Sequence, residues 1–346
     1  MKKNLVIVES PRKANTINKI LGKEYNIVAS MGHVRDLPEK GLSVDIEHDF
    51  KPEYEIIPSR RKVIQKLQQA VKAAEGVYLA PDPDREGEAI AWHLYEILHK
   101  KNKNARFHRV TFHEITRSAI QQAFAHVGQI NMALVNAQQA RRILDRIVGY
   151  QTSDLVRRQI ANASSAGRVQ SVALRIICER QDEIDNFKPE EYWLIDAIFQ
   201  EPPDGPQFPM RLVAIDDEKV KIGSEKLCLE YCSDIRQGVY QVTLVTTKPG
   251  LRRPKPPFIT STLQQAASSN LSMSPAQTMR VAQQLYEGVE GAEHLGGLIT
   301  YMRTDSVNVA KEAQEAAREF ISAHFGREFV PGKPNVYRSR NTAQEA

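Results

Sequence analysis

The chain has 346 residues, which at about 150 residues per domain is enough for two or three compact domains. Its composition, 41% hydrophobic and 26% charged, is that of a globular protein. No apolar run approaches the roughly 18 residues that a membrane helix needs. The three cysteines are too few for a disulfide framework or a four-ligand zinc site. We therefore expect a cytoplasmic protein that does not span a membrane.

The charge pattern weakly favours a nucleic-acid partner. Lysine and arginine number 47 against 42 acidic residues, a formal net charge of +5. Basic residues cluster at 141–146, 157–168 and 251–255, whereas acidic residues concentrate at 82–88. The sequence lacks the glycine-rich phosphate loop, the dinucleotide fingerprint, the HExxH zinc motif and the GxSxG elbow, so those enzyme classes are disfavoured.

Strand and helix signals alternate over the first 125 residues. Short apolar runs predict strands at Leu5–Val8, Tyr25–Ala29 and Val77–Ala80. Apolar residues at helical spacing predict helices over 14–21, closed by Gly22, and over 63–71 and 89–98. This alternation is typical of a parallel α/β domain, which we place at residues 1–125.

Helical patterns dominate the rest of the chain, apart from one β region. Helices are predicted from Asn131 onward and over 169–177, 263–271, 279–286 and 310–320, with an extended piece at 298–303. Prolines at 202–209 indicate a boundary, alternating stretches predict strands at 211–215 and 239–245, and a basic, proline-rich connector follows at 252–257. The predicted fold class is therefore α/β plus α, with domains at 1–125, 126–203, 204–257 and 258–346.

Acidic residues follow two of the predicted strands. Asp82, Asp84 and Glu86 come directly after the strand that ends at Ala80, and Glu9 follows the first strand. Ligands usually bind at the carboxyl ends of parallel strands, and carboxylate oxygens suit a hard cation such as Mg²⁺. A solvated turn before a helix N-terminus, where acidic residues are favoured in any case, explains the residues equally well.

Two basic segments are candidates for binding phosphate. Residues 164–170 have the composition of a helix start, whose free N–H groups and Arg168 suit an anion. An ordinary serine N-cap accounts for the same residues more simply. The pair Arg141 and Arg142 suits either a phosphate track or a solvated helix face.

Tyr301 and Arg303 lie two residues apart, so in an extended chain both side chains point to one side. There a tyrosine hydroxyl can attack phosphorus while the guanidinium stabilises charge on the phosphoryl oxygens. A packed structural tyrosine is the plainer alternative, since the chain holds eleven tyrosines.

Six motifs, in this order, resemble the type IA DNA topoisomerase family and most closely its bacterial DNA topoisomerase I branch. They are V-I-V-E-S-P at 6–11, G-H-V-R-D-L-P at 32–38, D-P-D-R-E-G-E-A at 82–89, S-A-G-R-V-Q-S at 165–171, P-P-F-I-T-S-T-L-Q-Q at 256–265 and G-L-I-T-Y-M-R-T-D-S at 297–306. The topoisomerase III branch has proline at the position of Met302. The resemblance implies a toprim α/β domain at 1–125, part of a helical single-strand groove at 126–203, part of a β arch at 204–257 and a helical domain carrying the nucleophile at 258–346.

The resemblance also implies roles for individual residues. Tyr301 is expected to break one DNA strand through a 5′-phosphotyrosyl link, and Arg303 to stabilise the transition state. Glu9 is expected to act as general acid and base, and Lys13 to neutralise phosphate. The expected ligands of Mg²⁺ are Glu9, Asp82, Asp84 and Glu86. The expected DNA contacts are His33, Arg141, Arg142, Asp145, Tyr150, Arg157, Ser165, Ala166, Gly167, Arg168, Val169, Gln170 and Arg303.

The implied activity is relaxation of negatively supercoiled DNA without ATP, by a cytoplasmic, nucleoid-associated monomer that binds single-stranded DNA. The chain ends at Gln344-Glu345-Ala346, before the rest of the family's arch and helical domains and before a histidine that assists Tyr301. We therefore expect an open ring that has lost strand passage. The alternatives are a non-catalytic single-strand-binding fragment and a toprim nuclease or primase, the latter leaving Tyr301 and Arg303 unexplained.

Overall fold

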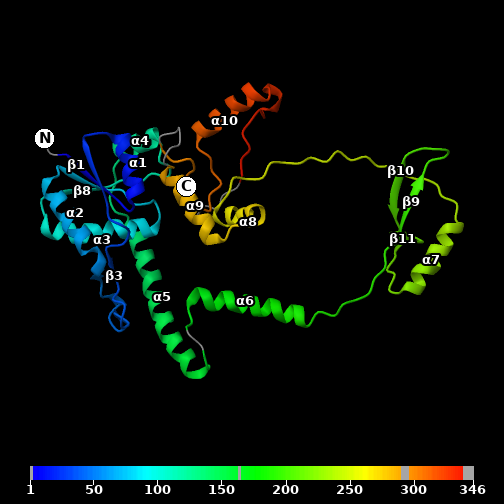
Figure 1. The fold of residues 1–346 in the computed structure, drawn as a ribbon, viewed down its shortest axis with the longest axis horizontal. Coiled ribbons are helices and arrows are strands. Elements are labelled where there is room, and N and C mark those ends of the chain that lie inside the picture. The colour runs from blue at the N-terminus through cyan, green and yellow to red at the C-terminus, as the bar shows by residue number, and fades with distance from the viewer. Residues whose placement is uncertain (1–2, 163–164, 290–295, 338–346) are drawn as a thin grey trace. The chain divides into compact units, whose positions relative to one another are not determined.

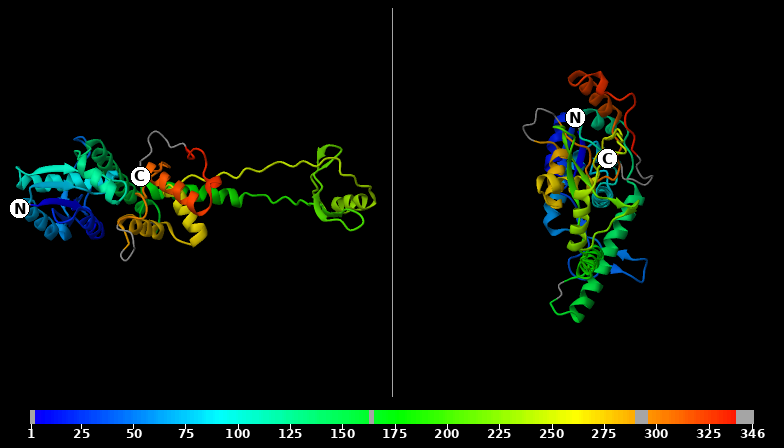
Figure 2. Two further views of the ribbon diagram at one scale, coloured as in Figure 1. Left: turned by 90° about the horizontal axis from the view of Figure 1, so that it is seen from above. Right: turned by 90° about the vertical axis from the view of Figure 1, so that its right-hand side faces the viewer.

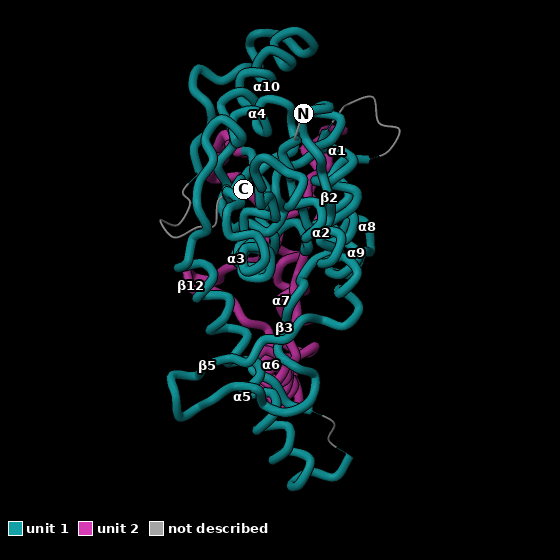
Figure 3. Tube along the Cα trace, turned by 90° about the vertical axis from the view of Figure 1, so that its left-hand side faces the viewer, with its two compact units in different colours: residues 1–168, 254–346 teal, residues 169–253 magenta. Residues whose placement is uncertain are grey.

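The computed structural model describes residues 3–162, 165–289 and 296–337 (Figure 1). The chain divides into two compact units, residues 1–168 with 254–346 and residues 169–253 (Figure 3). The boundary at 253/254 falls inside the predicted basic connector, and the division into four domains stays a prediction. Residues 344–346, on which the expectation of an open ring is based, lie outside the described residues. Among the residues that are described, no helix is long and apolar enough to cross a membrane.

A four-stranded parallel sheet in the order β2-β1-β7-β8 lies at the centre of the first unit. Its strands are β1 (Asn4–Val8), β2 (Tyr25–Ala29), β7 (Gly76–Leu79) and β8 (Arg106–Arg109). The first three confirm the predicted strands. Sequence patterns do not reveal β8, because two arginines and a histidine leave it without an apolar run.

Helices cover both faces of this sheet (Figures 1 and 2). On one face lie α1 (Pro11–Leu21) and α4 (Arg117–Ala125), and on the other α2 (Arg61–Ala73) and α3 (Arg85–Lys101). Side chains of β1 alternate between the two cores, with Val6 and Val8 packed on the α1 side and Leu5 and Ile7 on the α2 side. All four are 0% exposed, because a central parallel strand is covered on both faces.

The remaining elements of the first unit surround this α/β core. Between β2 and α2 lie the paired strands β3 (Arg35–Asp36) and β6 (Glu55–Ile56), the paired strands β4 (Val44–Asp45) and β5 (Lys51–Pro52), and the short helix η1 (Pro58–Arg60). The long helix α5 (Met132–Gln159) packs against α3. The C-terminal helices are α8 (Thr260–Leu271), α9 (Pro275–Glu287), α10 (Lys311–His324) and η2 (Arg327–Phe329). The predicted helices from Asn131, at 263–271, at 279–286 and at 310–320 are confirmed.

One segment of the first unit is less regular than predicted. The structure has no strand at 298–303, where an extended piece is expected. Single hydrogen bonds hold this backbone instead, from Leu298 N to Leu285 O and from Tyr301 N to His113 O, each at 2.8 Å. These isolated hydrogen bonds fix the segment against other parts of the first unit, but they do not form the ladder that defines a strand.

The second unit is small and has its own core. It contains α6 (Arg168–Asp185, which begins at the last residue of the first unit), the antiparallel strands β9 (Asp196–Gln200) and β10 (Gln207–Arg211), the pair β11 (Ala214–Ile215) and β12 (Glu218–Lys219), and α7 (Glu225–Gln237). Ile195, Ile222 and Cys228 form its buried centre. The prolines at 202–209 lie in and beside the β9–β10 hairpin turn, inside one unit.

The predicted strand at 239–245 is wrong. The structure shows irregular chain there, with Val239 100% and Leu244 80% exposed. Alternating apolar residues favour a strand, but its backbone groups also need a neighbouring strand to pair with. No described strand pairs with this segment.

A buried histidine on α3 has a lowered pKa. His93, on α3, packs against Tyr54 and Trp92 and accepts a hydrogen bond from Arg35 Nε at 2.8 Å. Burial, and then the positive charge of Arg35, lower the pKa of His93 to about 3. Nearby His33 opposes protonation as well, while Asp36 favours it.

We expect this histidine to weaken the fold below its unfolded-state pKa, near pH 6.5. The unfolded chain binds a proton there that the native ring excludes, so stability is complete above that pH and falls by about 1.4 kcal/mol per unit below it. Urea unfolding at about pH 7.5 and about pH 5.5 should show a smaller loss, by about 1.4 kcal/mol, in His93→Gln than in the parent. His48→Gln, at a 78% exposed side chain, is the control. Equal losses in the parent and His93→Gln would contradict this account.

Candidate active site

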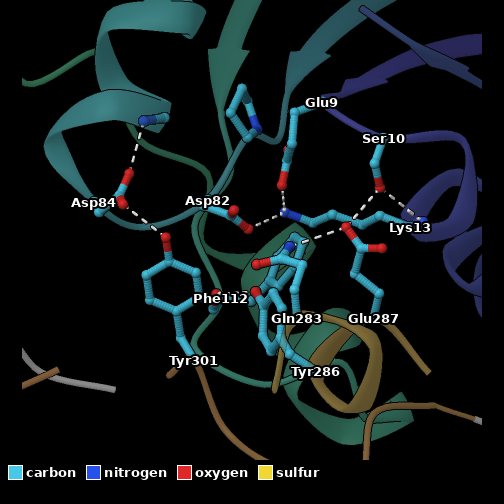
Figure 4. Close-up of polar contacts among 12 residues, drawn as sticks. Glu9, Ser10, Lys13, Asp82, Asp84, Phe112, Gln283, Tyr286, Glu287 and Tyr301 are labelled. Atoms are coloured by element: carbon cyan, nitrogen blue, oxygen red, sulfur yellow. Dashed lines mark hydrogen bonds and ion pairs between the residues drawn. The ribbon is translucent and has the colours of Figure 1, made fainter. Parts of the chain in front are cut away.

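Lys13 joins two carboxylates at the carboxyl edge of the sheet (Figure 4). Its ammonium donates to Glu9 Oε1, just after β1, at 2.9 Å and to Asp82 Oδ1, after β7, at 2.8 Å. The lysine is 0% exposed, and Nζ lies 4.7 Å from the centroid of the Phe112 ring. Ser10 caps α1 by accepting from Lys13 N at 3.1 Å, which fixes the start of the helix that carries the lysine.

Burial and mutual attraction act together on the pKa values of this cluster. Burial raises the pKa of Glu9 to about 8, although the Lys13 ammonium favours the ionised form. Burial also acts upward on Asp82, but Lys13 holds the pKa of Asp82 below its usual value. Burial acts downward on Lys13, yet Asp82 and Glu9 raise its pKa, so the lysine stays a cation. Glu9 Oε2 is buried and has no hydrogen-bond partner among the described residues.

The acidic loop turns directly into α3. Asp84 is the N-cap of this helix, and its Oδ1 accepts from Gly87 N at 2.8 Å. A Cβ on Gly87 would lie 2.1 Å from the carbonyl oxygen of Asp82, so only glycine lets the helix approach the loop this closely. Glu86 accepts from Gln138 Nε2 at 3.0 Å and lies 3.4 Å from His33 Nε2.

Arg109, at the end of β8, holds the acidic loop in place. Its guanidinium donates to Glu88 Oε2 at 2.9 Å and to the carbonyl oxygens of Leu79, Pro81, Asp82 and Val110. The side chains of the Arg109–Glu88 pair are 2% and 3% exposed. Glu88 Oε1 also accepts from Asn131 N at 2.6 Å, at the start of α5. Sequence reasoning missed this pair, because a single buried arginine leaves no periodic signal.

Tyr301 reaches the same edge from the irregular segment after α9. Its hydroxyl donates to Asp84 Oδ2 at 2.6 Å, and the residue is only 1% exposed. Its ring packs edge-on against Tyr286, with centroids 5.2 Å apart. Burial raises the pKa of Tyr301, and Asp82 and Asp84 raise it further, so the hydroxyl keeps its proton in this arrangement. Arg303 lies 3.4 Å from the same Asp84 oxygen, so both side chains meet at one atom.

One cavity of about 750 Å³ contains most of the predicted catalytic and metal-binding residues. Its lining includes Glu9, His33, Asp82, Asp84, Glu86, Tyr301 and Arg303. In the described part of the chain, no three His, Cys, Asp or Glu side chains lie close enough together to hold one metal ion. Lys13 lies between two of the predicted ligands, and Asp84 is engaged by Gly87 and Tyr301. The donors nevertheless suit a hard cation, since carboxylates border one cavity and Glu9 Oε2 is unpartnered.

A second cavity, of about 930 Å³, lies along α5 and gathers five of the predicted DNA contacts. These are Arg142, Asp145, Tyr150, Arg157 and Ala166. Arg142 binds Asp36 through two hydrogen bonds of 2.9 and 2.8 Å. Asp145 accepts from Arg168 Nε at 2.8 Å and lies 3.8 Å from Arg141 Nε. The predicted contacts Val169 and Gln170 lie in the second unit, exposed on α6.

Two further residues shape this groove and escape sequence reasoning. Ser153 Oγ accepts from Ala166 N at 2.9 Å and donates to Ala166 O at 3.0 Å, which fixes the segment with Ser165 and Gly167 before α6. Arg146 is buried and donates to the carbonyl oxygens of Leu37, Pro38 and Gly41. Both act through backbone atoms that are distant in sequence.

Comparisons with known proteins agree with this geometry. Residues 129–346 match the family described as DNA topoisomerase, and residues 4–115 match the Toprim domain. The chain belongs to the type IA DNA topoisomerase family. It is 49% identical to DNA topoisomerase 1 of Campylobacter jejuni over 100% of this chain and 49% of that protein, and 46% identical to that of Rickettsia prowazekii over 99% and 45%. The structure of full-length topoisomerase I from Thermotoga maritima matches with a TM-score of 0.79 and 41% identity, over 94% of this chain and 54% of that chain.

Family membership explains how the cavity is assembled. The residues that match the Toprim domain form the sheet and its acidic edge. The residues that match the DNA topoisomerase family form α5 and α9 and include Tyr301. The two matches meet where Tyr301 contacts Asp84. The predicted family and the toprim α/β fold with helical regions are confirmed. The chain spans about half the length of the curated relatives it matches.

We expect Arg109→Met to lower the free energy of unfolding by about 3–5 kcal/mol, because it leaves Glu88 as an unpaired buried charge and removes a side-chain donor from four carbonyl groups. Arg158→Met is the matched control, since Arg158 pairs with Asp154 on the surface at 74% exposure. It should cost less than about 0.5 kcal/mol. Chemical denaturation measures the free energy of unfolding of both variants. Similar losses of stability in the two would refute the role given to Arg109.

Proposed function

We propose that this chain carries the DNA cleavage and resealing centre of a type IA topoisomerase. The observation that best supports the proposal is the 2.6 Å hydrogen bond from Tyr301 to Asp84 in a cavity that Glu9 and Arg303 also line. In this proposal Tyr301 is the nucleophile, Asp84 is the proton acceptor, and the guanidinium of Arg303 stabilises charge at the same edge of the sheet. A toprim nuclease or primase would have no use for this tyrosine.

The proposed cleavage step exchanges one phosphoester bond for another and moves two protons. Tyr301 Oη attacks the phosphorus while the bond from phosphorus to the 3′ oxygen breaks. The tyrosine proton passes to Asp84, which already accepts its hydrogen bond, and Glu9 donates a proton to the leaving 3′ oxygen. The products are a 5′-phosphotyrosyl ester and a 3′-hydroxyl, and resealing reverses each transfer. Because the ester conserves the free energy of the broken phosphodiester, ATP is not required.

This arrangement has to open before DNA is cut. Tyr301 is 1% exposed and Asp84 is 6% exposed, so a phosphate reaches the hydroxyl only when the chain segments that enclose this hydrogen-bonded pair move apart. The side chain of Arg303 is 55% exposed and lies next to that contact. Its planar guanidinium is suited to bind phosphoryl oxygens as they arrive.

The acidic residues are the proposed holders of Mg²⁺. Asp82, Asp84 and Glu86, with Glu9, offer the carboxylate oxygens that this ion prefers. When bound, the ion would neutralise negative charge on the DNA phosphate. The proton transfers above use only the protein's own side chains.

For the whole enzyme we propose relaxation of negatively supercoiled DNA, by a monomer in the cytoplasm at the nucleoid. A second candidate is a single-strand-binding protein without catalysis, which is favoured by the burial and raised pKa of Tyr301. The two differ in whether the protein becomes covalently linked to DNA.

The decisive variant is Tyr301→Phe. It removes the proposed nucleophilic oxygen, so the covalent adduct on a 3′-end-labelled single-stranded oligonucleotide should disappear from a denaturing gel while binding is retained. Folding should change by no more than about 1–2 kcal/mol, the usual range for one hydrogen bond, including one to a charged group. Tyr286→Phe is the matched control, because this second buried tyrosine packs against Tyr301 but its hydroxyl faces Phe112 O at 3.4 Å. Adduct formation by Tyr301→Phe would refute the mechanism, and binding without adduct by the parent would favour the second candidate.

The groove along α5 is the proposed track for single-stranded DNA. Neutralising Arg141 and Arg157 with glutamine should shrink the slope of log affinity against log salt by about 1.4, at about 0.7 for each lost phosphate contact. Fluorescence anisotropy with a single-stranded oligonucleotide makes the measurement. Arg327→Gln with Lys333→Gln, two exposed cations elsewhere in the first unit, should leave the slope unchanged. An unchanged slope in the Arg141 and Arg157 variant would indicate an ordinary solvated helix face.

A further inference from the structure

A strip of exposed cations lies on α2 and at the end of α3, and none of its residues lines either cavity described above. This α2–α3 basic strip consists of Arg61, Lys62, Lys66, Lys72, Lys100, Lys101, Lys103 and Arg106, all exposed. Within the described ranges none of the eight forms an ion pair with a carboxylate. The strip is therefore a concentration of positive charge that the protein does not neutralise internally.

The outer face of α2 is unusually one-sided in charge. Ile64, Leu67 and Val71 face the core, and the rest of this 13-residue helix contains four cations, three glutamines and no acidic residue. A solvated helix normally mixes both signs, because oppositely charged pairs one turn apart stabilise it. Because α2 contains no acidic residue, it has no oppositely charged pair of this kind to stabilise it.

The position of these charges also opposes helix stability. Arg60 is the N-cap, and Arg61 and Lys62 begin the helix, where the backbone dipole disfavours cations. The first turn has no acidic residue, and Arg60 makes no side-chain cap. Arg60 Nε is moreover buried without a hydrogen-bond partner in the described part of the chain. Local folding therefore does not explain why cations stand here. The lysines at the end of α3 suit that helix's dipole and carry less weight.

The strip is continuous from one helix to the other. Lys101 Nζ donates to Gln68 Oε1 at 3.4 Å, which ties the end of α3 to α2 (Figure 1). Each helix leads into a strand of the parallel sheet, so Lys72 and Lys100 lie toward the amino edge of the sheet and Arg61 toward the carboxyl edge, where Asp82 lies. At 1.5 Å per residue α2 alone extends about 20 Å, roughly the length of six base pairs.

We propose that the α2–α3 basic strip binds the phosphate backbone of duplex DNA, next to the single-stranded segment that is cut. This inference rests on the proposed function, since it assigns a second DNA contact to the same enzyme. The strip's cations suit phosphates. No large exposed hydrophobic or aromatic side chain lies on α2 or on 99–106, so the surface lacks the stacking platform typical of single-strand binding. It likewise lacks the apolar anchors of a membrane-surface helix.

The test is a variant with Arg61, Lys62, Lys66 and Lys72 all changed to glutamine. Its affinity for a duplex of about 30 base pairs, measured by anisotropy against salt concentration, should fall, and the log–log slope should shrink by up to about 3.6, at about 0.9 for each lost contact. The slope for a single-stranded oligonucleotide and the adduct formed by Tyr301 should not change. Thermal unfolding checks that the variant is folded.

A control of equal charge separates the strip from net charge. Lys19, Lys23, Lys51 and Lys311 lie elsewhere in the first unit, exposed and without an ion pair to any residue that the structure describes. Their change to glutamine removes the same number of charges. The proposal is overturned if this control lowers the duplex slope as much, if the strip variant keeps the parent's slope, or if the strip is needed for binding anionic phosphatidylglycerol vesicles and not duplex DNA. Loss of the adduct in the parent protein would instead count against the proposed function alone.

Discussion

The buried ammonium of Lys13 is the interaction on which the acidic edge of the sheet depends. Glu9 and Asp82 follow neighbouring strands, so the sheet places two largely buried carboxylates close together. Unpaired, they would repel each other and lose their hydration. The ammonium offsets both effects with one charge, and the ring of Phe112 covers it. Breaking a buried ion pair costs about 3–5 kcal/mol. This contact therefore fixes the positions of the ends of β1 and β7 relative to α1, which carries Lys13.

A second buried cation extends the same principle to the loop itself. Arg109 donates hydrogen bonds to the carbonyl groups of the acidic loop and to Glu88. Glu88 in turn accepts a hydrogen bond from Asn131 N, which links the loop to the start of α5. The side chains that line the cavity thus stand on irregular segments whose backbone is fixed by charged groups from regular elements. Tyr301 completes the cavity from a distant part of the chain, where burial and the nearby Asp82 and Asp84 carboxylates keep its hydroxyl protonated.

Local patterns predicted much of the fold. The apolar run of β1 and the helical spacing of Val63, Leu67 and Val71 identify their elements, because burial on one face or on both faces imposes a regular spacing of apolar residues. The same logic misplaced a strand at 239–245, where alternation is present and a pairing partner is not. It also missed β8, because Arg109 in this strand pairs with a buried glutamate, Glu88, that a local window does not include.

By itself, the sequence determined the motifs, the α/β alternation and the family, since each depends on residue identity and short spacing. Only the tertiary structure decided that Lys13 lies between Glu9 and Asp82, that Arg109 holds the loop, and that Asp84 accepts from a tyrosine 217 residues away. The physical reason is that burial, hydrogen bonding and the pKa of each group depend on neighbours in space. A carboxylate in a motif becomes a ligand, a helix cap or a proton acceptor according to the side chain that the fold brings to it.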